Sequence, residues 1–532
     1  MSNILLSILI VIPLLGALGV LIVPAVYKRL YKYIALSVSV IQLMLVIIIY
    51  QGFDMSMSGI NSIEGFQFVE NVSWINLELA SLGKLSINYF VGIDGIGFSM
   101  VILSVLVLLV AVISSWKVTE KVKGYFSLFL LLNSSIIGCF IALDFFLFYL
   151  FFEFMLLPMY FLIGIWGGKR REYASIKFFL YTLLGSILIL VVMVALYLSV
   201  DLPSGGHTFS LLSMMDSNNF TSGSLLSLNG TYDIFGVPAR NMGFLLLFIG
   251  FAIKIPAVPV HTWLPDAHVE APTAISVILA GILLKIGGYG LIRIAYSIFP
   301  DAAIHYAWLV ALLGVISIIW GAFNALSCTD LKRLIAYSSI SHMGFVLLGL
   351  AALTTEGVAG SVYQMFSHGI ISSGLFLLAG VIYDRTGNRI IGNYSGLAHR
   401  MPKYTVMVVI LFFASLGLPG FSGFIAEILV FLGAFNSLLF SKWLTVIATL
   451  GLLLSAAYYL WTIQRMFFGK YFVRNAEWDK SIVDLSKQEM IMLVPLIFVT
   501  ILLGVFPHFL LDLLNSSVGA FVTFVNETGL AN

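Results

Sequence analysis

Four charged side chains lie deep inside long apolar stretches of this sequence: Glu153, Lys254, Lys285 and Glu427. The first three lie about ten to thirteen residues from the start of their stretches, which is roughly 15–20 Å along a helix. Glu427 follows Pro419 inside another apolar stretch. In the middle of a bilayer each such charge costs roughly 2.5–3.5 kcal/mol and cannot easily reach water. The cost argues against a role in stability and favours a function.

Buried carboxylates and amines are suited to carrying protons. Burial disfavours the charged form of both groups, whereas a nearby opposite charge favours it. A lysine whose carboxylate partner can approach or withdraw is therefore a switchable proton binder. We expect Glu153 to set the proton affinity of Lys254, Lys285 to pass the proton at the centre, and Glu427 to lie on the release side. The alternative is a set of structural ion pairs that only hold helices together.

Further titratable side chains could join such a relay. His261, His342 and His368 lie in or at the ends of apolar stretches, and a neutral imidazole can both accept and donate a proton. They could equally be packing residues, and His342 with His368 could instead clamp a haem. Asp144 begins an apolar stretch, where a carboxylate also stabilises a helix N-terminus.

The elements that carry these residues are membrane helices. Of the 532 residues, 60% are hydrophobic and 10% are charged, a composition that no soluble fold can bury. The apolar residues form runs of about 20, the length that spans a bilayer. We predict an all-α integral membrane fold with about 14 transmembrane helices, at about 3–26, 31–50, 94–115, 124–143, 145–167, 174–199, 241–264, 273–298, 303–325, 334–354, 360–384, 404–435, 441–467 and 488–513. The polar stretches 51–90 and 200–240 are expected to be surface loops.

The basic residues predict the orientation of the chain. Most of the 27 lysine and arginine residues fall in the odd-numbered loops, whereas the opposite side holds only Lys84, Arg240, Arg293 and Lys442. Because cytoplasmic loops collect positive charge, both termini are expected on the non-cytoplasmic side. The loop with Asp266, His268 and Glu270 lacks a basic residue and could be a functional vestibule.

Two predicted helices should be broken in the middle. Helix 7 contains Pro256 and Pro259, and helix 12 contains the segment GLPGFSG at 417–423. Each is the fourth member of a five-helix set, so helices 4–8 and 9–13 are expected to form two inverted five-helix repeats. The predicted parts of the single membrane domain 1–532 are N-terminal helices at 1–120, repeats at 124–298 and 303–467, and a final helix with its tail at 488–532.

Redox and nucleotide-binding motifs are absent from the sequence. Its two cysteines, Cys139 and Cys328, are far apart, and no Gly-rich phosphate-binding loop occurs. We therefore expect no metal and no cofactor on this chain and no nucleic-acid partner. The energy for transport must come from a partner subunit or from an ion gradient.

Three segments resemble the antiporter-like subunits of respiratory complex I, the proton-pumping NADH:quinone oxidoreductase. They are FEFMLLPMYFLI at 152–163, KIPAVPVHTWLPDAHVEAPT at 254–273 and DLKRLIAYSSISHMG at 330–344. The resemblance implies the same inverted-repeat fold and a proton relay through Glu153, Lys254, Lys285 and Glu427. Glutamate at position 427 favours the chain M (subunit 4) branch of this family, because the related chains L and N carry lysine at that position. The short tail also favours chain M, because chain L adds a long lateral helix after its core.

The resemblance also implies partner subunits, the cofactors that they bind, and a cellular location. Its partners would be other membrane-arm subunits, especially neighbouring antiporter-like ones, and lipid, while FMN, iron-sulfur clusters and quinone would be bound by partner subunits. The expected location is the bacterial plasma (inner) membrane rather than the mitochondrial one. Alternatives are a subunit of an Mrp-type sodium/proton antiporter and a passive scaffold that only anchors the membrane arm.

Overall fold

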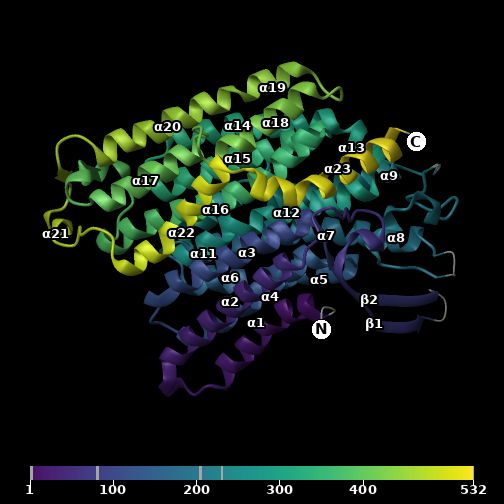
Figure 1. Ribbon diagram of the computed structural model, residues 1–532, viewed down its shortest axis with the longest axis horizontal. Coiled ribbons are helices and arrows are strands. Elements are labelled where there is room, and N and C mark those ends of the chain that lie inside the picture. The colour runs from purple at the N-terminus through teal and green to yellow at the C-terminus, as the bar shows by residue number, and fades with distance from the viewer. Residues whose placement is uncertain (1–3, 80–82, 203–205, 229, 231, 531–532) are drawn as a thin grey trace.

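Long helices run side by side along the longest axis of the molecule (Figure 1). The computed structural model describes residues 4–79, 83–202, 206–228, 230 and 232–530. Among them, thirteen helical stretches are long and apolar enough to cross a membrane. The uninterrupted ones are α1 (Leu5–Ile22), α2 (Lys28–Gln51), α3 (Gly95–Ser114), α4 (Val122–Ile141), α7 (Arg171–Ser199), α14 (Ala307–Ser327), α15 (Leu331–Ala352), α16 (Thr355–Thr386), α22 (Lys487–Val505) and α23 (His508–Leu530). The predicted all-α membrane fold is confirmed.

Several predicted helices are interrupted. Helices 7 and 12 break as predicted, while helices 5, 8 and 13 change geometry without a complete break. The pieces are α5 (Phe145–Phe154) and α6 (Leu156–Trp166); α9 (Ala239–Lys254) and α10 (Trp263–Glu270); α11 (Thr273–Ile278), η6 (Leu279–Leu283), α12 (Leu284–Gly290) and η7 (Leu291–Tyr296); α17 (Pro402–Ser415) and α18 (Ser422–Asn436); and α19 (Lys442–Ala448) and α20 (Leu450–Phe467).

The two complete breaks have clear local causes. Between α9 and α10, Pro256 and Pro259 cannot donate backbone hydrogen bonds, so the chain leaves the helix for eight residues. Between α17 and α18, Gly417 and Gly420 adopt positive φ angles of 77° and 96°, which side chains with a Cβ rarely tolerate. Most of the break between α9 and α10 is buried or half-buried in protein, whereas residues 418–420 in the break between α17 and α18 are exposed.

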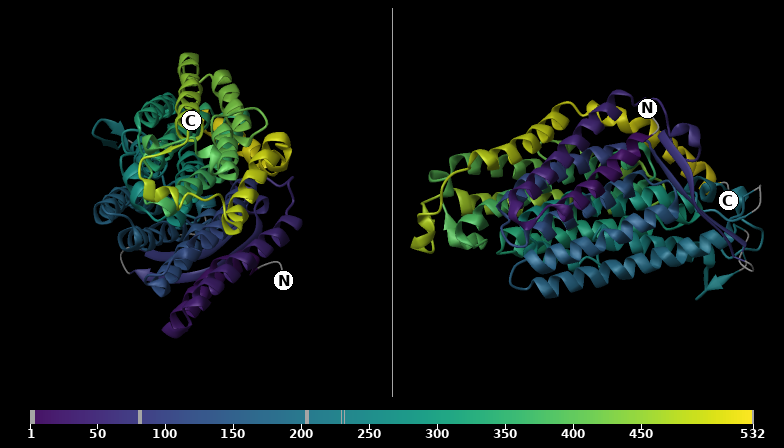
Figure 2. Two further views of the ribbon diagram at one scale, coloured as in Figure 1. Left: turned by 90° about the vertical axis from the view of Figure 1, so that its left-hand side faces the viewer. Right: turned by 90° about the horizontal axis from the view of Figure 1, so that it is seen from below.

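The centre of the bundle differs from its rim. Helix 8 (273–296) and α16 are buried on all sides, and α15 is almost as enclosed. The rim helices instead expose large apolar side chains, such as Leu184 of α7, Leu453 of α20 and Phe498 of α22. Viewed from one end, α1 and α2 form a pair that projects from the bundle (Figure 2). An apolar rim around a centre that holds buried charges is the arrangement expected in a bilayer.

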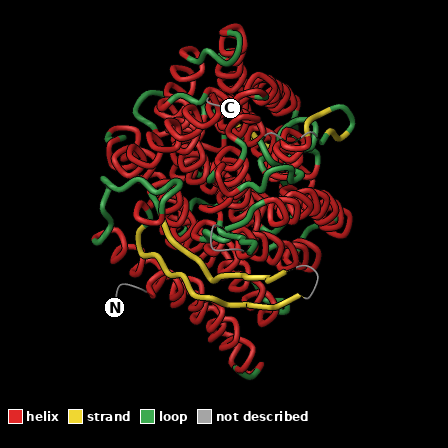
Figure 3. Tube along the Cα trace, turned by 90° about the vertical axis from the view of Figure 1, so that its right-hand side faces the viewer, coloured by secondary structure: helices red, strands yellow, loops and turns green. Residues whose placement is uncertain are grey.

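The two polar stretches are more structured than the predicted surface loops. Part of 51–90 forms an antiparallel hairpin of β1 (Gln67–Leu79) and β2 (Gly83–Ile93), which lies across one end of the bundle (Figure 3). β-branched and aromatic residues such as Val72, Trp74 and Ile87 favour strands there. The stretch 200–240 holds α8 (Leu211–Met215), η5 (Ser217–Asn219), β3 (Asp233–Ile234) and β4 (Val237–Pro238).

The C-terminal part also departs from the prediction. The predicted final helix 488–513 ends at Val505, because Pro507 interrupts it, and the separate helix α23 follows. Figure 1 shows α22 and α23 together running along the bundle once, so that α1 begins and α23 ends toward the same end. The remaining short elements are η2 (Ala25–Tyr27), η3 (Ile63–Gly65), η4 (Ser115–Lys117), α13 (Pro300–His305), η8 (Ile391–Asn393), β5 (Tyr394–Ser395), η9 (Leu397–His399), β6 (Phe472–Val473) and α21 (Ala476–Asp479).

Candidate proton-transfer site

Glu153 lies at a local break between α5 and α6. Pro158 has no N–H to donate to the carbonyl of Phe154, so the helix loosens one residue after the glutamate. The Oε2 atom of Glu153 is buried and has no hydrogen-bond partner among the described residues. The sequence placed this group at membrane depth, but the break beside it was not predicted.

Lys254 is the last residue of α9 and is almost completely buried. Its Nζ has no hydrogen-bond partner among the described residues and lies 4.9 Å from the centre of the Phe152 ring and 5.6 Å from that of Phe178. Cys139 and Glu153 are its electrostatic neighbours. No ion pair within 4 Å joins the described side chains of Glu153 and Lys254. In this conformation the two residues therefore do not hold their helices together as a structural ion pair.

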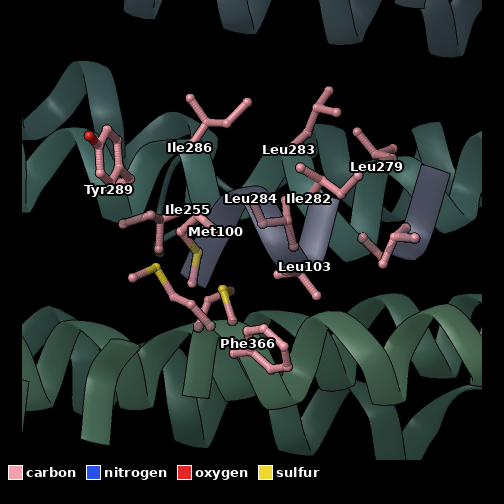
Figure 4. Close-up of a cluster of buried hydrophobic side chains, with 14 of the residues drawn as sticks. Met100, Leu103, Ile255, Leu279, Ile282, Leu283, Leu284, Ile286, Tyr289 and Phe366 are labelled. Carbon is pink, nitrogen blue, oxygen red and sulfur yellow. The ribbon is translucent and has the colours of Figure 1, made fainter. Parts of the chain in front are cut away.

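Lys285 lies on α12, in the fully buried helix 8. The π-helical turns of η6 and η7 flank α12, and the Lys285 ammonium donates to the carbonyl of Ala280 in η6 over 2.5 Å. Its Nζ also lies 2.7 Å from Nδ1 of His368 on α16. Figure 4 shows the wall of this region, formed by apolar side chains that include Met100, Leu103, Ile255, Ile282, Leu284, Ile286 and Phe366. A polar contact inside an apolar wall is protected from competing water.

His342 on α15 continues the polar path toward helix 12. The ring centres of His342 and His368 are 5.5 Å apart. The Nε2 atom of His342 lies 3.1 Å from the hydroxyl of Ser415, and its Nδ1 lies 3.2 Å from Nε2 of Gln364. The same Nδ1 lies 3.7 Å from Oε1 of Glu427. His342 therefore connects the middle of the bundle to the break in helix 12.

Glu427 lies on α18, just after the break in helix 12, and is almost completely buried. A small void of about 10 Å³ opens between it and the two histidines; its lining residues are His342, Gln364, Ser367, His368, Ile371, Ala414, Ser415, Gly423 and Glu427. This volume accommodates about one water molecule. The structure thus brings Lys285, His368, His342 and Glu427 into one continuous row. The void is far too small for a porphyrin, so the alternative of a haem between the two histidines is wrong.

Two other candidates lie apart from this row. His261 lies in the break between α9 and α10, and its Nδ1 has no partner among the described residues. Asp144 caps α5, since its Oδ1 accepts from the backbone N–H of Leu147 over 3.0 Å. Burial raises the pKa of Asp144 to about 6. The capping role offered as one interpretation of Asp144 is thus present in the structure.

The structure adds two features to the candidate relay residues of the sequence analysis. Asp94 caps α3, and it also forms a fully buried ion pair with Arg293, with 2.6 Å between Oδ1 and Nη2. The sequence analysis placed Arg293 on the side of the membrane that has few basic residues. In the structure Arg293 lies in helix 8 and is fully buried. His268 of α10 is also fully buried, and neither of its ring nitrogens has a partner among the described residues. The absence of basic residues in its loop was the only signal for it.

The described residues contain no group of three or more His, Cys, Asp or Glu side chains placed to hold a metal ion. The buried polar groups of the site are instead arranged in pairs from helix to helix. Each pair can exchange a proton by a small movement, because amines, imidazoles and carboxyls all gain and lose protons. The site is thus chemically equipped for proton transfer.

Comparison with known proteins agrees with this chemistry. Residues 142–455 match the family model described as NADH:quinone oxidoreductase/Mrp antiporter, TM, a region that includes all eight candidate residues. The NADH-quinone oxidoreductase subunit M of Rhodobacter capsulatus is 42% identical over 523 residues, covering 97% of this chain and 96% of the relative.

Solved structures show the same fold. A chain of respiratory complex I from Thermus thermophilus superimposes with a TM-score of 0.80 at 29% identity, with 99% of this chain and 100% of that chain covered. A chain of the Mrp complex from Dietzia sp. has a TM-score of 0.80 at 21% identity and covers 99% of each chain, a likeness of fold alone. The family model and the curated relatives together show that this chain belongs to the NADH-quinone oxidoreductase subunit M family of antiporter-like membrane proteins.

Proposed function

We propose that this chain translocates protons as a membrane-arm subunit of an NADH:quinone oxidoreductase, driven by electron transfer in its partner subunits. The observation that carries the proposal is the buried row Lys285, His368, His342 and Glu427, whose members lie within contact distance of one another from helix 8 to helix 12. A row of this length has no structural justification, because each unpaired buried charge destabilises the fold.

The proton transfers follow from the side chains in order. Protonated Lys285 can donate through its Nζ to Nδ1 of His368, and the imidazole can then release a proton from Nε2. His342 accepts next, and its Nδ1 faces the Glu427 carboxyl. Once protonated, Glu427 is neutral in its apolar surroundings, and its position at the irregular backbone of helix 12 suits release from the row.

Glu153 and Lys254 act as the switch in this proposal. Lys254 ends α9 immediately before the broken segment, and Glu153 lies beside the looser joint of α5 and α6. Small shifts at these two joints would change the distance between the opposite charges. A closer Glu153 holds the proton on Lys254, and a more distant one lets it leave toward Lys285.

The remaining roles belong to partners. FMN, iron-sulfur clusters and quinone are proposed to bind to other subunits, and neighbouring antiporter-like subunits are proposed to flank this chain. We place the protein in the bacterial plasma membrane with both termini outside the cytoplasm, because the basic loops lie on the opposite side.

The two five-helix repeats are proposed to be the mechanical units, joined at the contact of Lys285 with His368.

The test uses the assembled complex reconstituted in proteoliposomes. Lys254→Ala and Glu427→Ala should each lower the proton gradient formed per NADH oxidised, with the complex still assembled. Full pumping in both variants would contradict the proposal and favour a passive scaffold. A sodium-dependent exchange activity without NADH-oxidising partners would instead favour the antiporter alternative, for which the resemblance in fold to the Mrp complex is the supporting observation.

A further inference from the structure

We infer that His268 is the entry residue through which protons pass from a cytoplasmic-side cavity to the row of Lys285, His368, His342 and Glu427. The inference rests on the proposed function and adds to it the residue that loads the row. Its starting point is a fully buried imidazole that the relay described above does not use. His268 lies on α10, immediately after the broken part of helix 7.

The surroundings of His268 point to a transfer role rather than to packing. Both ring nitrogens are buried without a hydrogen-bond partner among the described residues, although a packing histidine normally satisfies at least one. One ring face stacks on Phe376 of α16, with ring centres 4.4 Å apart and planes 10° from parallel. The stack fixes the plane of the imidazole while leaving both nitrogens at its edge free to exchange protons.

A cavity of about 520 Å³, large enough for many water molecules, is lined by Val269, the residue that follows His268. It includes Glu270 and Ala271 from the end of α10 and the loop that follows, and it opens among basic and acidic side chains such as Lys117, Asp330 and Arg389. These residues belong to the loops that collect positive charge, so the cavity faces the proposed cytoplasmic side.

Lys332 links this cavity to the buried histidine. It lines the cavity, is almost completely buried, and donates from Nζ to the carbonyl of Ala271 over 2.6 Å. Ala271 follows α10 directly, and the carbonyl of His268 itself accepts from the hydroxyl of Ser276 at 3.2 Å. Lys332 is also an electrostatic neighbour of the His268 ring. A proton that reaches Lys332 from the cavity therefore arrives beside His268.

The second link is electrostatic and joins His268 to the row. Lys285 and His368 are both within electrostatic range of its ring. The Nε2 atom of His368 is buried and has no partner among the described residues, while its Nδ1 is already engaged with Lys285. In the proposed step one nitrogen of His268 gains a proton from the Lys332 side and the other nitrogen loses one. Nζ of Lys285, left neutral after its donation to His368, receives that proton. The charge of the imidazole is unchanged after the step.

Chemical rescue tests this role in the assembled complex in inside-out membrane vesicles, whose cytoplasmic face is outward. His268→Ala should lower the rate of NADH-driven proton pumping, since losing a positioned proton carrier slows its step by roughly 100-fold or more. Added imidazole should restore pumping through the cavity, whereas pyrazole, which has a similar shape but is a much weaker base, should not. Phe376→Leu removes the stack but keeps the imidazole; as the matched control it should lower pumping less than His268→Ala does, and added imidazole should not raise its pumping.

Each outcome decides between transfer and packing. Equal restoration by imidazole and pyrazole, or no restoration by either in a correctly assembled complex, would assign His268 to packing and overturn the inference. Normal pumping in His268→Ala would do the same. Lys254→Ala is measured in parallel, because full pumping in that variant contradicts the proposed function itself rather than the entry role of His268.

Discussion

The Lys285 ammonium nitrogen lies 2.7 Å from Nδ1 of His368, and this contact joins the two halves of the fold. Lys285 belongs to the first proposed repeat and His368 to the second. The bond can be made with the proton on either nitrogen, because an amine and an imidazole each serve as donor or acceptor when suitably protonated. Transfer between the repeats then needs no long-range movement of either side chain.

Replacing Lys285 with methionine should stop transfer between the repeats. Methionine fills a similar volume but has no proton to give, so the transfer step should slow by roughly 100-fold or more. The measurement is the proton gradient formed per NADH oxidised in reconstituted complexes, with assembly checked on native gels. A Lys285→Met complex that pumps at the normal ratio would remove Lys285 from the relay.

A His342→Gln variant separates hydrogen bonding from proton transfer at the next position. Glutamine can still bond to Ser415 and Gln364, so the fold should be retained, yet its amide does not titrate and pumping should fall. His342→Ala should additionally lower the melting temperature, because leaving buried polar partners unpaired costs about 1–3 kcal/mol each. Thermal unfolding and pumping measured together distinguish these effects. Normal pumping with glutamine would indicate a structural histidine.

Pumping should depend on both the carboxyl group and the side-chain length of Glu427. Glu427→Gln keeps the shape but cannot carry the proton, and we expect it to reduce pumping most. Glu427→Asp keeps the carboxyl but withdraws it from His342, which is already 3.7 Å away, so an intermediate pumping rate is expected. Stopped-flow recording of the proton gradient checks the order. A glutamine variant that outperforms the aspartate variant would contradict the proton-carrying role.

Asp144 should behave as a helix cap with a distinctive pH dependence. Burial raises its pKa to about 6, so ionisation opposes folding and the stability of its neutral form is lost as the pH rises from about 4 to about 6. Asp144→Asn keeps the cap without ionising, and it should match the natural protein below about pH 4 and melt at a higher temperature at about pH 7.5. Asp144→Ala should be about 1 kcal/mol less stable than Asp144→Asn at both pH values, because it lacks the cap and neither side chain ionises.

Pumping by these variants decides the second interpretation of Asp144. If Asp144 is only a cap, Asp144→Asn should pump normally. A large loss of pumping in that variant, with α5 intact, would place Asp144 in the relay.

The buried pair of Asp94 and Arg293 should be a structural requirement. Removing one partner leaves the other charge buried and unpaired, at a cost of roughly 3–5 kcal/mol. Arg293→Leu and Asp94→Leu should therefore each impair assembly strongly, whereas the double variant should recover part of the lost stability. Thermal melts of the purified complexes test this, and double-variant damage equal to the sum of the single ones would argue against direct coupling.

The sequence by itself determined that this is a membrane protein, roughly where its helices lie, and that helices 7 and 12 are broken. Runs of about 20 apolar residues admit no other fold, and Pro256, Pro259 and Gly417 act on their own backbone whatever surrounds them. The deep positions of Lys285 and Glu427 could be read in the same way, because depth follows from counting residues along a helix.

Tertiary structure alone decided which of these groups meet. Lys285 and His368 are 83 residues apart, and His342 and Glu427 come from different helices, so their contacts depend on helix packing and rotation. The π-helical turns beside Lys285 and the buried pair of Asp94 and Arg293 depend on the same packing. Local propensity cannot specify them, because the free energy that holds these groups together comes from long-range contacts that no stretch of sequence contains.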